Sequence, residues 1–203
     1  MTANYPVPST ACEVCYEIKK SRFIALATFA DTRESAMDWL AEVKRKYPDA
    51  RHHCWAYQFG NPKSAASAAM SDDGEPSGTA GKPILNVLQH KNVGDVMIIV
   101  TRYFGGIKLG AGGLVRAYSA AAQMAMEGLK TEQQVARDQL ELSCSFGQEQ
   151  PLRHWLSLHD GLVENIEYSD QVAMTIALPS IHRSLFFQYM ASIGGRIDND
   201  QCG

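Results

Sequence analysis

The sequence predicts a two-domain α+β protein, and three observations lead to this fold class. Strand-like and helix-like stretches alternate along all 203 residues, a length that suits one large domain or two small ones. Residues 1–134 hold 15 Lys+Arg against 13 Asp+Glu, whereas residues 135–203 hold 4 against 9. The polar stretch Thr131–Gln134, which we interpret as a linker, lies where this balance changes. We therefore expect one domain at residues 1–134 and a second at residues 135–203.

The first half of the N-terminal domain is expected to hold a hairpin, a helix and two further strands. Residues 1–10 are polar with two prolines, which predicts a loose lead-in. Asp31 is the expected helix cap, because Glu34 follows three positions later as in a capping box. The expected elements are strands at Cys12–Lys19 and Arg22–Ala30, a helix from Asp31 to Tyr47, a strand at His52–Phe59 and a short strand at Ala65–Met70.

Two glycine-rich loops flank the most apolar strand of the chain. Nine of the 16 glycines lie between Ser71 and Tyr118, and none falls inside Val96–Val100, which is apolar on both faces as in a central strand. Helices are predicted at Pro83–His90 and at Gly113–Leu129. Glycine is useful where the backbone bends sharply or approaches a ligand, so the two loops predict a surface shaped for binding. The alternative interpretation is two tight connections in a compact fold.

The C-terminal domain shows the order βαββαβ of the ferredoxin-like arrangement. Strict alternation predicts its first strand through Leu140, Leu142, Cys144 and Phe146. The elements expected after it are a helix with Leu152, Trp155, Leu156 and His159, strands at Leu162–Tyr168 and Val172–Leu178, a helix with Ile181, Leu185, Tyr189 and Ile193, and a last strand at Arg196–Asp198.

Composition excludes several classes of protein. No apolar run approaches the roughly 18 residues of a membrane span, and the N-terminus lacks the features of a signal peptide, so we expect a cytoplasmic protein without a membrane partner. The five cysteines (Cys12, Cys15, Cys54, Cys144 and Cys202) are odd in number and scattered, which fits a reducing compartment. Cys12 and Cys15 have metal-ligand spacing, but no second pair follows, and we expect no metal there.

The charge distribution confines any contact with nucleic acid to one domain. A net charge of −3 argues against a general polyanion binder. The balance is +2 for residues 1–134 and −5 for residues 135–203, from the counts given above. Contacts with phosphate should therefore come from the N-terminal domain.

The second glycine loop has the context of an anion site. The range Gly105–Gly113 follows a strand and opens a helix, where backbone N–H groups and the helix dipole favour phosphate. Known nucleotide motifs fit poorly, because Gly110 is followed by Ala111 instead of the Lys of a Walker loop. We predict a site for an RNA or nucleotide phosphate, without catalysis, formed by Lys82, Arg102, Gly105, Gly106, Lys108, Gly110, Gly112, Gly113 and Arg116, with Lys108 and Arg116 exposed.

The first glycine loop carries acids whose role the sequence leaves open. Asp72, Asp73 and Glu75 could ligate magnesium or act as acid and base, but Asp73-Gly74 and Glu75-Pro76 also have the chemistry of turns, which we favour. Thr79 would then cap the next helix, with Lys82-Pro83 at its start.

The chain shows no set of residues typical of a catalytic site. His52 and His53 beside Arg51 invite a ligand or base interpretation, but neighbours on a strand face opposite ways, so at most one serves a given site. No Ser/His/Asp or Cys/His set is discernible, and we predict no catalytic residue, metal or cofactor.

Three long motifs carry a resemblance to a known family. Together they resemble the IMPACT family, and most closely its bacterial YigZ branch, with the resemblance covering nearly the whole chain. The motifs depart from the family pattern only at Phe104, where a second tyrosine is common. They are Arg51-His52-His53-Cys54, Ser71-Asp72-Asp73-Gly74-Glu75-Pro76-x-Gly78-Thr79-Ala80-Gly81-x-Pro83 and Arg102-Tyr103-Phe104-Gly105-Gly106-x-x-Leu109-Gly110-x-Gly112-Gly113-Leu114-Val115-x-Ala117-Tyr118.

The resemblance implies both a fold and a field of activity. It implies an N-terminal domain like the second domain of ribosomal protein S-five and a ferredoxin-like C-terminal domain like the last domain of elongation factor G. Eukaryotic members restrain translational control by competing for the activator of an initiation-factor kinase. Bacteria lack that kinase pathway, so the resemblance implies RNA, ribosome or translation-factor binding here. Its motif residues Arg51, His52, His53, Asp72, Asp73, Glu75 and Thr79 carry over without an assigned role.

The sequence as a whole thus predicts a non-enzymatic protein that binds RNA or the ribosome and acts as a regulator of translation. The first alternative is a magnesium-dependent enzyme, or a binder of a phosphorylated small molecule, that uses Asp72, Asp73 or Glu75. The second alternative is a protein-interaction module.

Overall fold

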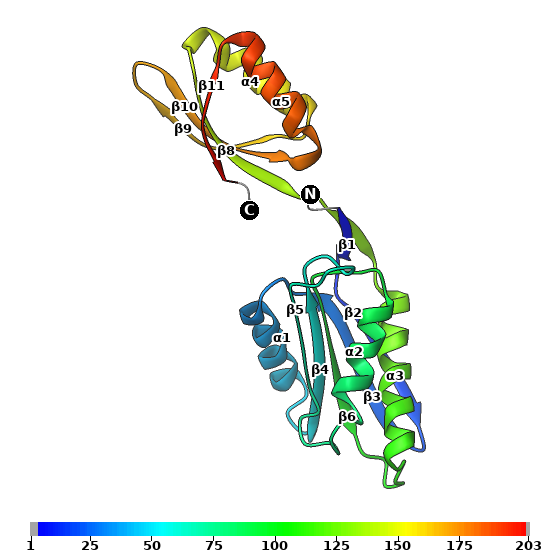
Figure 1. Ribbon diagram of the computed structural model, residues 1–203. Helices are drawn as coiled ribbons and strands as arrows, with labels where there is room; N and C mark the ends of the chain where they lie inside the picture. Colours follow the sequence, from blue (N-terminus) through cyan, green and yellow to red (C-terminus); the bar gives the residue numbers. More distant parts are fainter. Residues whose placement is uncertain (1–3, 202–203) are drawn as a thin grey trace. The chain divides into compact units, whose positions relative to one another are not determined.

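The protein has a mixed α/β fold with two compact units, seen in a computed structural model that describes residues 4–201 (Figure 1). The N-terminal unit comprises residues 4–134 and the C-terminal unit residues 135–201. Each unit buries its own apolar core. Cys202 lies outside the described residues. Among the described residues, no helix is both long enough and apolar enough to cross a membrane.

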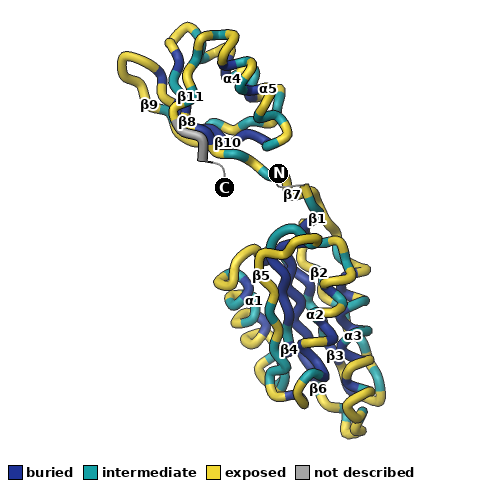
Figure 2. Tube along the Cα trace, viewed as in Figure 1, coloured by how far each residue is buried: buried dark blue, intermediate teal, exposed yellow. Residues whose placement is uncertain are grey.

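A five-stranded antiparallel sheet forms the centre of the N-terminal unit. In spatial order its strands are β2 (Cys12–Ile18), β3 (Ser21–Phe29), β6 (Val96–Tyr103), β4 (His52–Phe59) and β5 (Ser67–Ser71). The apolar run of β6 is fully buried between β3 and β4, which confirms the predicted central strand. Figure 2 shows the buried backbone concentrated in these middle strands.

Three helices cover the two faces of this sheet. Helices α2 (Gly81–His90) and α3 (Ala111–Gly128) lie on one face, and α1 (Arg33–Lys46) lies on the other (Figure 1). The predicted apolar stripe of α3 is buried against the sheet, with Leu114, Ala117, Tyr118, Ala121 and Ala125. The aromatic residues of β4 stack beneath α1, with ring centroids 5.5 Å apart for Trp55 and Tyr57 and 4.0 Å for Tyr57 and Phe59.

Local chemistry explains how these elements begin. Lys19 and Lys20 both have positive φ, as the tight turn of a twisted two-residue hairpin requires. The predicted cap of α1 was wrong by one residue, because Thr32 caps the helix in place of Asp31. Thr32 has an extended backbone, which brings its hydroxyl to the amide of Ser35 at 3.2 Å in a capping box.

The prediction of a loose lead-in and a polar linker was wrong, because the two segments pair with each other. Strand β1 (Tyr5–Pro8) pairs antiparallel with β7 (Thr131–Gln134). The Tyr5 hydroxyl donates to the Asp95 carboxylate at 2.7 Å, and Val7 is buried. Long-range contacts of this kind override the polar composition of both segments.

The C-terminal unit has the element order βαββαβ. Its elements are β8 (Arg137–Cys144), α4 (Phe146–Leu158), β9 (Leu162–Tyr168), β10 (Val172–Pro179), a short 3-10 turn at Ser180–His182, α5 (Arg183–Ile193) and β11 (Arg196–Gln201). The sheet order is β11-β8-β10-β9, with every pair antiparallel. Helices α4 and α5 pack their apolar side chains on one face of this sheet.

Two predicted details of this unit were wrong. The alternating strand ends at Cys144, because Ser145 caps α4. Phe146 therefore belongs to that helix, where its side chain is exposed. The buried face of α5 is formed by Phe186 and Met190, whereas Leu185 is exposed. The predicted stripe had begun at Ile181, which lies before the helix in the 3-10 turn.

Candidate nucleic-acid interface

The first glycine loop begins with a tight turn. The amide of Glu75 donates to the Asp72 carbonyl at 2.9 Å, and both central residues, Asp73 and Gly74, have positive φ. Asp-Gly at these two positions is typical of a type I′ turn, since neither residue is strongly strained there. The interpretation of this dipeptide as turn chemistry is therefore confirmed.

The side chain of Asp72 caps α2 from a distance in sequence. Its carboxylate accepts hydrogen bonds from the amides of Gly78, Ala80 and Gly81 at 2.8–3.0 Å. Partial burial raises the pKa of Asp72, but the three backbone donors outweigh it and hold the pKa below its usual value. Thr79, which we predicted to cap this helix, instead donates from its hydroxyl to the Pro76 carbonyl at 2.6 Å.

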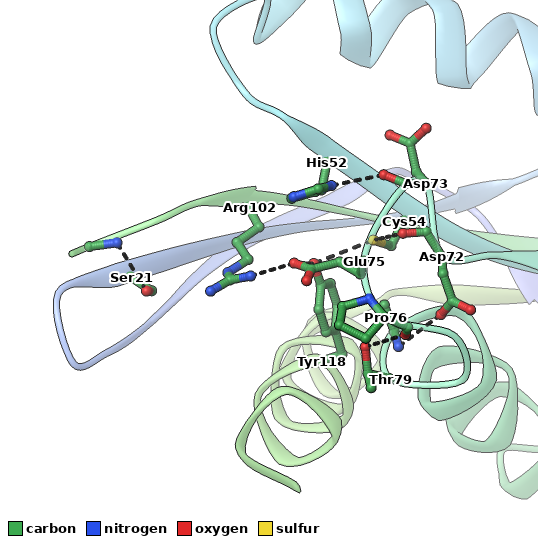
Figure 3. Close-up of polar contacts among 12 residues, drawn as sticks. Ser21, His52, Cys54, Asp72, Asp73, Glu75, Pro76, Thr79, Arg102 and Tyr118 are labelled. Carbon is green, nitrogen blue, oxygen red and sulfur yellow. Dashed lines mark hydrogen bonds and ion pairs between the residues drawn. The ribbon is translucent and has the colours of Figure 1, made fainter. Parts of the chain in front are cut away.

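A buried polar network lies behind the same loop (Figure 3). Glu75 Oε1 accepts from Arg102 Nη1 at 2.5 Å and from the Tyr118 hydroxyl at 2.9 Å. The Cys54 thiol lies 3.3 Å from that hydroxyl. Burial raises the pKa of the Cys54 thiol to about 12 and raises that of Tyr118 far above its usual value. Cys54 is therefore protonated at neutral pH and is not an activated nucleophile.

The two histidines of β4 face different surroundings, as strand geometry predicted. His52 is half-buried and donates from Nδ1 to the Asp73 carbonyl at 2.8 Å. His53 is buried and shares a hydrogen bond of 3.0 Å with the Thr101 hydroxyl. Burial lowers the pKa of His53, so that its ring is neutral at pH 7. Arg51, just before the strand, is exposed.

The three acids of the first loop do not converge (Figure 3). The Asp72 carboxylate faces the start of α2, Asp73 Oδ2 accepts from the His53 amide at 2.6 Å, and Glu75 faces Arg102. In the described part of the chain, no group of three or more His, Cys, Asp or Glu side chains is arranged to hold a metal ion. The magnesium alternative does not fit this donor arrangement.

The second glycine loop uses its glycines for different purposes. A Cβ on Gly105 would lie 2.0 Å from the backbone of Lys20, and its amide donates to the Ser21 hydroxyl at 3.1 Å. Close packing therefore explains this glycine, and its amide is already paired, while a phosphate contact at Gly105 stays a prediction. Gly106 and Gly110 have positive φ and open space around them. Gly110 combines φ 72° with ψ 166°, a region accessible only to glycine.

Helix α3 begins with amides that no side chain caps. Gly110 is its N-cap residue and supplies no side chain, while the first turn contains no acid. The first intrahelical bond runs from the Leu114 amide to the Gly110 carbonyl at 2.9 Å, so the amides of Ala111, Gly112 and Gly113 have no partner within the helix. The start of α3 thus lacks the carboxylate that Asp72 supplies to α2.

The predicted cations fall into three groups. Lys108 and Arg116 are exposed, as predicted, and Arg116 folds back over the first turn of α3, with Nη1 3.6 Å from the position of a Cβ on Gly112. Lys82 is exposed on α2, at the helix start that Asp72 already caps. Arg102 is nine-tenths buried and its charge is already paired with Glu75, so it is not a free cation at the loop, and its contact with phosphate stays a prediction. Glu75 lies 27 residues from Arg102 in the sequence, so no local sequence pattern could predict that the two side chains pair.

Two hollows meet at the side chains of Arg102 and Phe104. The helix-side hollow, of about 310 Å³, is lined by Glu75, Pro76, Arg102, Phe104, Lys108, Leu109, Gly110, Ala111 and Leu114. The strand-side hollow, of about 400 Å³, is lined by Asp49, Arg51, His52, Arg102, Tyr103 and Phe104. Sequence reasoning missed Tyr103 and Phe104 as site residues. The sequence did contain an indication of their role, because two aromatic residues stand at the end of a buried strand and directly before a glycine loop.

These features define a two-domain α/β protein with a basic glycine loop beside two open hollows. Comparison with protein families matches the Impact N-terminal domain to residues 19–126 and a domain of unknown function, DUF1949, to residues 142–184. The chain belongs to the IMPACT family.

Individual relatives match over most of their length. The chain is 40% identical over 177 residues to the IMPACT family member YigZ of Escherichia coli, covering 87% of each chain. It is 46% identical over 146 residues to an IMPACT family member of Haemophilus influenzae, covering 72% of this chain and 71% of that protein. A crystal structure of a hypothetical protein matches with a TM-score of 0.78 and 35% identity, covering 97% of both chains.

Proposed function

We propose that this protein binds RNA, free or within the ribosome, without catalysing a reaction, and that it acts in translation. The observation that carries the proposal is the start of α3, where uncapped amides meet the exposed cations Lys108 and Arg116. Backbone N–H groups at a helix start and nearby cations are a suitable site for a phosphate group. Membership of the IMPACT family supports the link to translation, because the eukaryotic members of that family act on translational control.

The contrast between the two glycine loops supports placing the phosphate on the second. At α2 three amides already bind the Asp72 carboxylate, so an incoming anion would have to displace it. At α3 an anion would meet amides that no side chain caps. Among the described residues that line the helix-side hollow, Glu75 is the only acid, and its charge is neutralised by Arg102. An anion approaching α3 therefore meets little repulsion at short range.

The C-terminal unit is a poor surface for RNA. The face of its sheet away from the helices carries a hollow of about 340 Å³ lined by Glu141, Glu167 and Asp198 among its eight residues, with no cation and no aromatic side chain. A phosphate backbone would be repelled there. This supports the N-terminal unit as the nucleic-acid interface.

We extend the proposal to the two folds and to the compartment. The N-terminal domain, residues 1–134, is proposed to be like the second domain of ribosomal protein S-five. The C-terminal domain, residues 135–203, is proposed to be ferredoxin-like, as the last domain of elongation factor G, which its βαββαβ order and sheet order support. Four described cysteines are unpaired, which supports a reducing compartment, and we place the protein in the cytoplasm.

Replacing both Lys108 and Arg116 with alanine should weaken RNA binding and reduce its salt dependence. If each cation neutralises one phosphate, the slope of log affinity against log salt should become less steep by about 1.4, because a single strand contributes about 0.7 per phosphate contact. The fold should persist, because changes at exposed charges alter stability by about 0.5 kcal/mol or less. The measurement is fluorescence anisotropy of a labelled single-stranded RNA about 12 nucleotides long, at salt from about 50 to 200 mM.

The matched control removes two charges from the other side of the unit. Arg33 and Arg45 are exposed on α1, which covers the opposite face of the sheet. Their double alanine variant has the same net charge as the Lys108 and Arg116 variant, and it should keep the parent's slope. Equal losses in the two double variants would mean that only net charge matters, and the proposed interface would be wrong.

A further inference from the structure

The ring of Phe104 is an exposed aromatic surface at the junction of the two hollows. It is 57% exposed, although it directly follows the buried strand β6. Phe104 lines both hollows, and Lys108 and the first residues of α3 line one of them. The ring is therefore open to a ligand that also contacts the cationic loop.

The chain holds this ring in place from behind. The guanidinium carbon of Arg102 lies 5.6 Å from the centroid of Phe104 and 5.6 Å from that of Phe23, which is fully buried. Glu75 fixes the same guanidinium through its hydrogen bond to Nη1. Arg102 is thus a positioning residue that links the exposed ring to the core, with a cation–π contact on each ring.

Arg102 also has a buried donor without a partner at the junction of the hollows. Its side chain is nine-tenths buried, it lines both hollows, and its Nε N–H has no hydrogen-bond partner. A buried donor without an acceptor is costly. An acceptor oxygen brought to this junction by a ligand would offset that cost.

We propose that Phe104 stacks against the base of an unpaired nucleotide whose phosphate lies at the start of α3. This inference rests on the proposed function, because it assigns the base to the same RNA whose phosphate the glycine loop binds. Aromatic rings beside a cationic groove bind single strands, since every base has a face that can stack. The protein then selects single-stranded RNA over duplex, where each base is already paired and stacked.

Replacing Phe104 with alanine tests this assignment. Affinity for a single-stranded RNA about 12 nucleotides long should fall roughly 5- to 100-fold, the range for loss of one stacked base. Affinity for a blunt duplex of the same length should stay within about twofold, because duplex contacts involve phosphates only. The salt slope should not change, since no charge is removed. Phe104→Trp should restore single-strand binding.

The C-terminal unit offers a closely matched control. Phe146 is 56% exposed, against 57% for Phe104, and lies at the start of α4. Phe146→Ala should leave the affinity for both RNAs at the parent level. Thermal unfolding of each variant checks that the substitution leaves the fold intact.

The outcomes separate this inference from the proposed function. If the parent binds neither RNA, both proposals are overturned. If the parent binds RNA and the Lys108 and Arg116 variant loses salt dependence, but Phe104→Ala binds single strands like the parent, only the stacking proposal is overturned. Equal losses for single strands and duplex overturn it as well. If adenosine monophosphate binds as tightly as the oligonucleotide, the ligand is a free nucleotide and the assignment to RNA is overturned.

Discussion

Replacing Glu75 with alanine is expected to lower the free energy of unfolding of the N-terminal unit by about 3–5 kcal/mol. The variant leaves the guanidinium of Arg102 buried without its counter-charge, and the hydroxyl of Tyr118 without its acceptor. Breaking one half of a buried ion pair costs this much because the remaining charge has lost both water and partner. Native-state hydrogen exchange of the β6 amides measures the effect within the full chain.

Two variants make this prediction specific. Glu75→Gln keeps a carbonyl acceptor and should lose clearly less stability than the alanine variant. Glu13, whose exposed ion pair with Lys46 spans 2.8 Å, is the control, and Glu13→Ala should cost about 1 kcal/mol or less. If Glu75→Ala were no more harmful than Glu13→Ala, the buried pair would not anchor the loop as we describe.

Replacing Asp72 with alanine should cost about 2–3 kcal/mol of stability at neutral pH, because three amides at the start of α2 lose a charged acceptor. The effect should be strongest in α2, whose amides should exchange faster. Asp72→Asn retains one acceptor oxygen without the charge, and it should fall between the parent and the alanine variant.

The contribution of Asp72 should depend on pH in a defined direction. Its folded pKa lies below the usual value, which means that the folded state favours the carboxylate. The stabilisation is therefore fully present above pH 4, near the unfolded pKa, and is lost as pH falls through the folded pKa. The difference between parent and Asp72→Asn should shrink in acid. Asp38, exposed on α1, is the control, and a pH-independent penalty at Asp72 would contradict the capping role.

Elements with strong local patterns could be predicted from the sequence. Alternation and apolar runs placed β4 and β9 within their observed bounds, and helical spacing gave the buried face of α3. Strand β1 escaped prediction because its stability comes from pairing with Thr131–Gln134 at the far end of the unit and from the Asp95 contact. Sequence patterns report local propensity, whereas this strand depends on contacts more than 80 residues apart.

In the candidate site, too, features with a local cause could be predicted, whereas features that depend on distant contacts could not. Exposure of Lys108 and Arg116 followed from the glycine context and the helix face. The roles of Arg102 and Glu75 depend on a contact across 27 residues, and no pattern indicates which acid a strand arginine will meet. Tyr118 was correctly predicted as a core residue. A buried tyrosine hydroxyl needs a hydrogen-bond partner, so the sequence alone could have indicated that a polar side chain lies next to it.

Amide chemical shifts during titration with single-stranded RNA about 12 nucleotides long test the central claim most directly. The account predicts that the largest changes fall on Phe104, Lys108 and the amides of Ala111, Gly112 and Gly113. Residues of the C-terminal sheet should change little, because its open face is acidic. Shifts concentrated in residues 137–201, or at the capped start of α2 with none at α3, would contradict the placement of RNA on the second glycine loop.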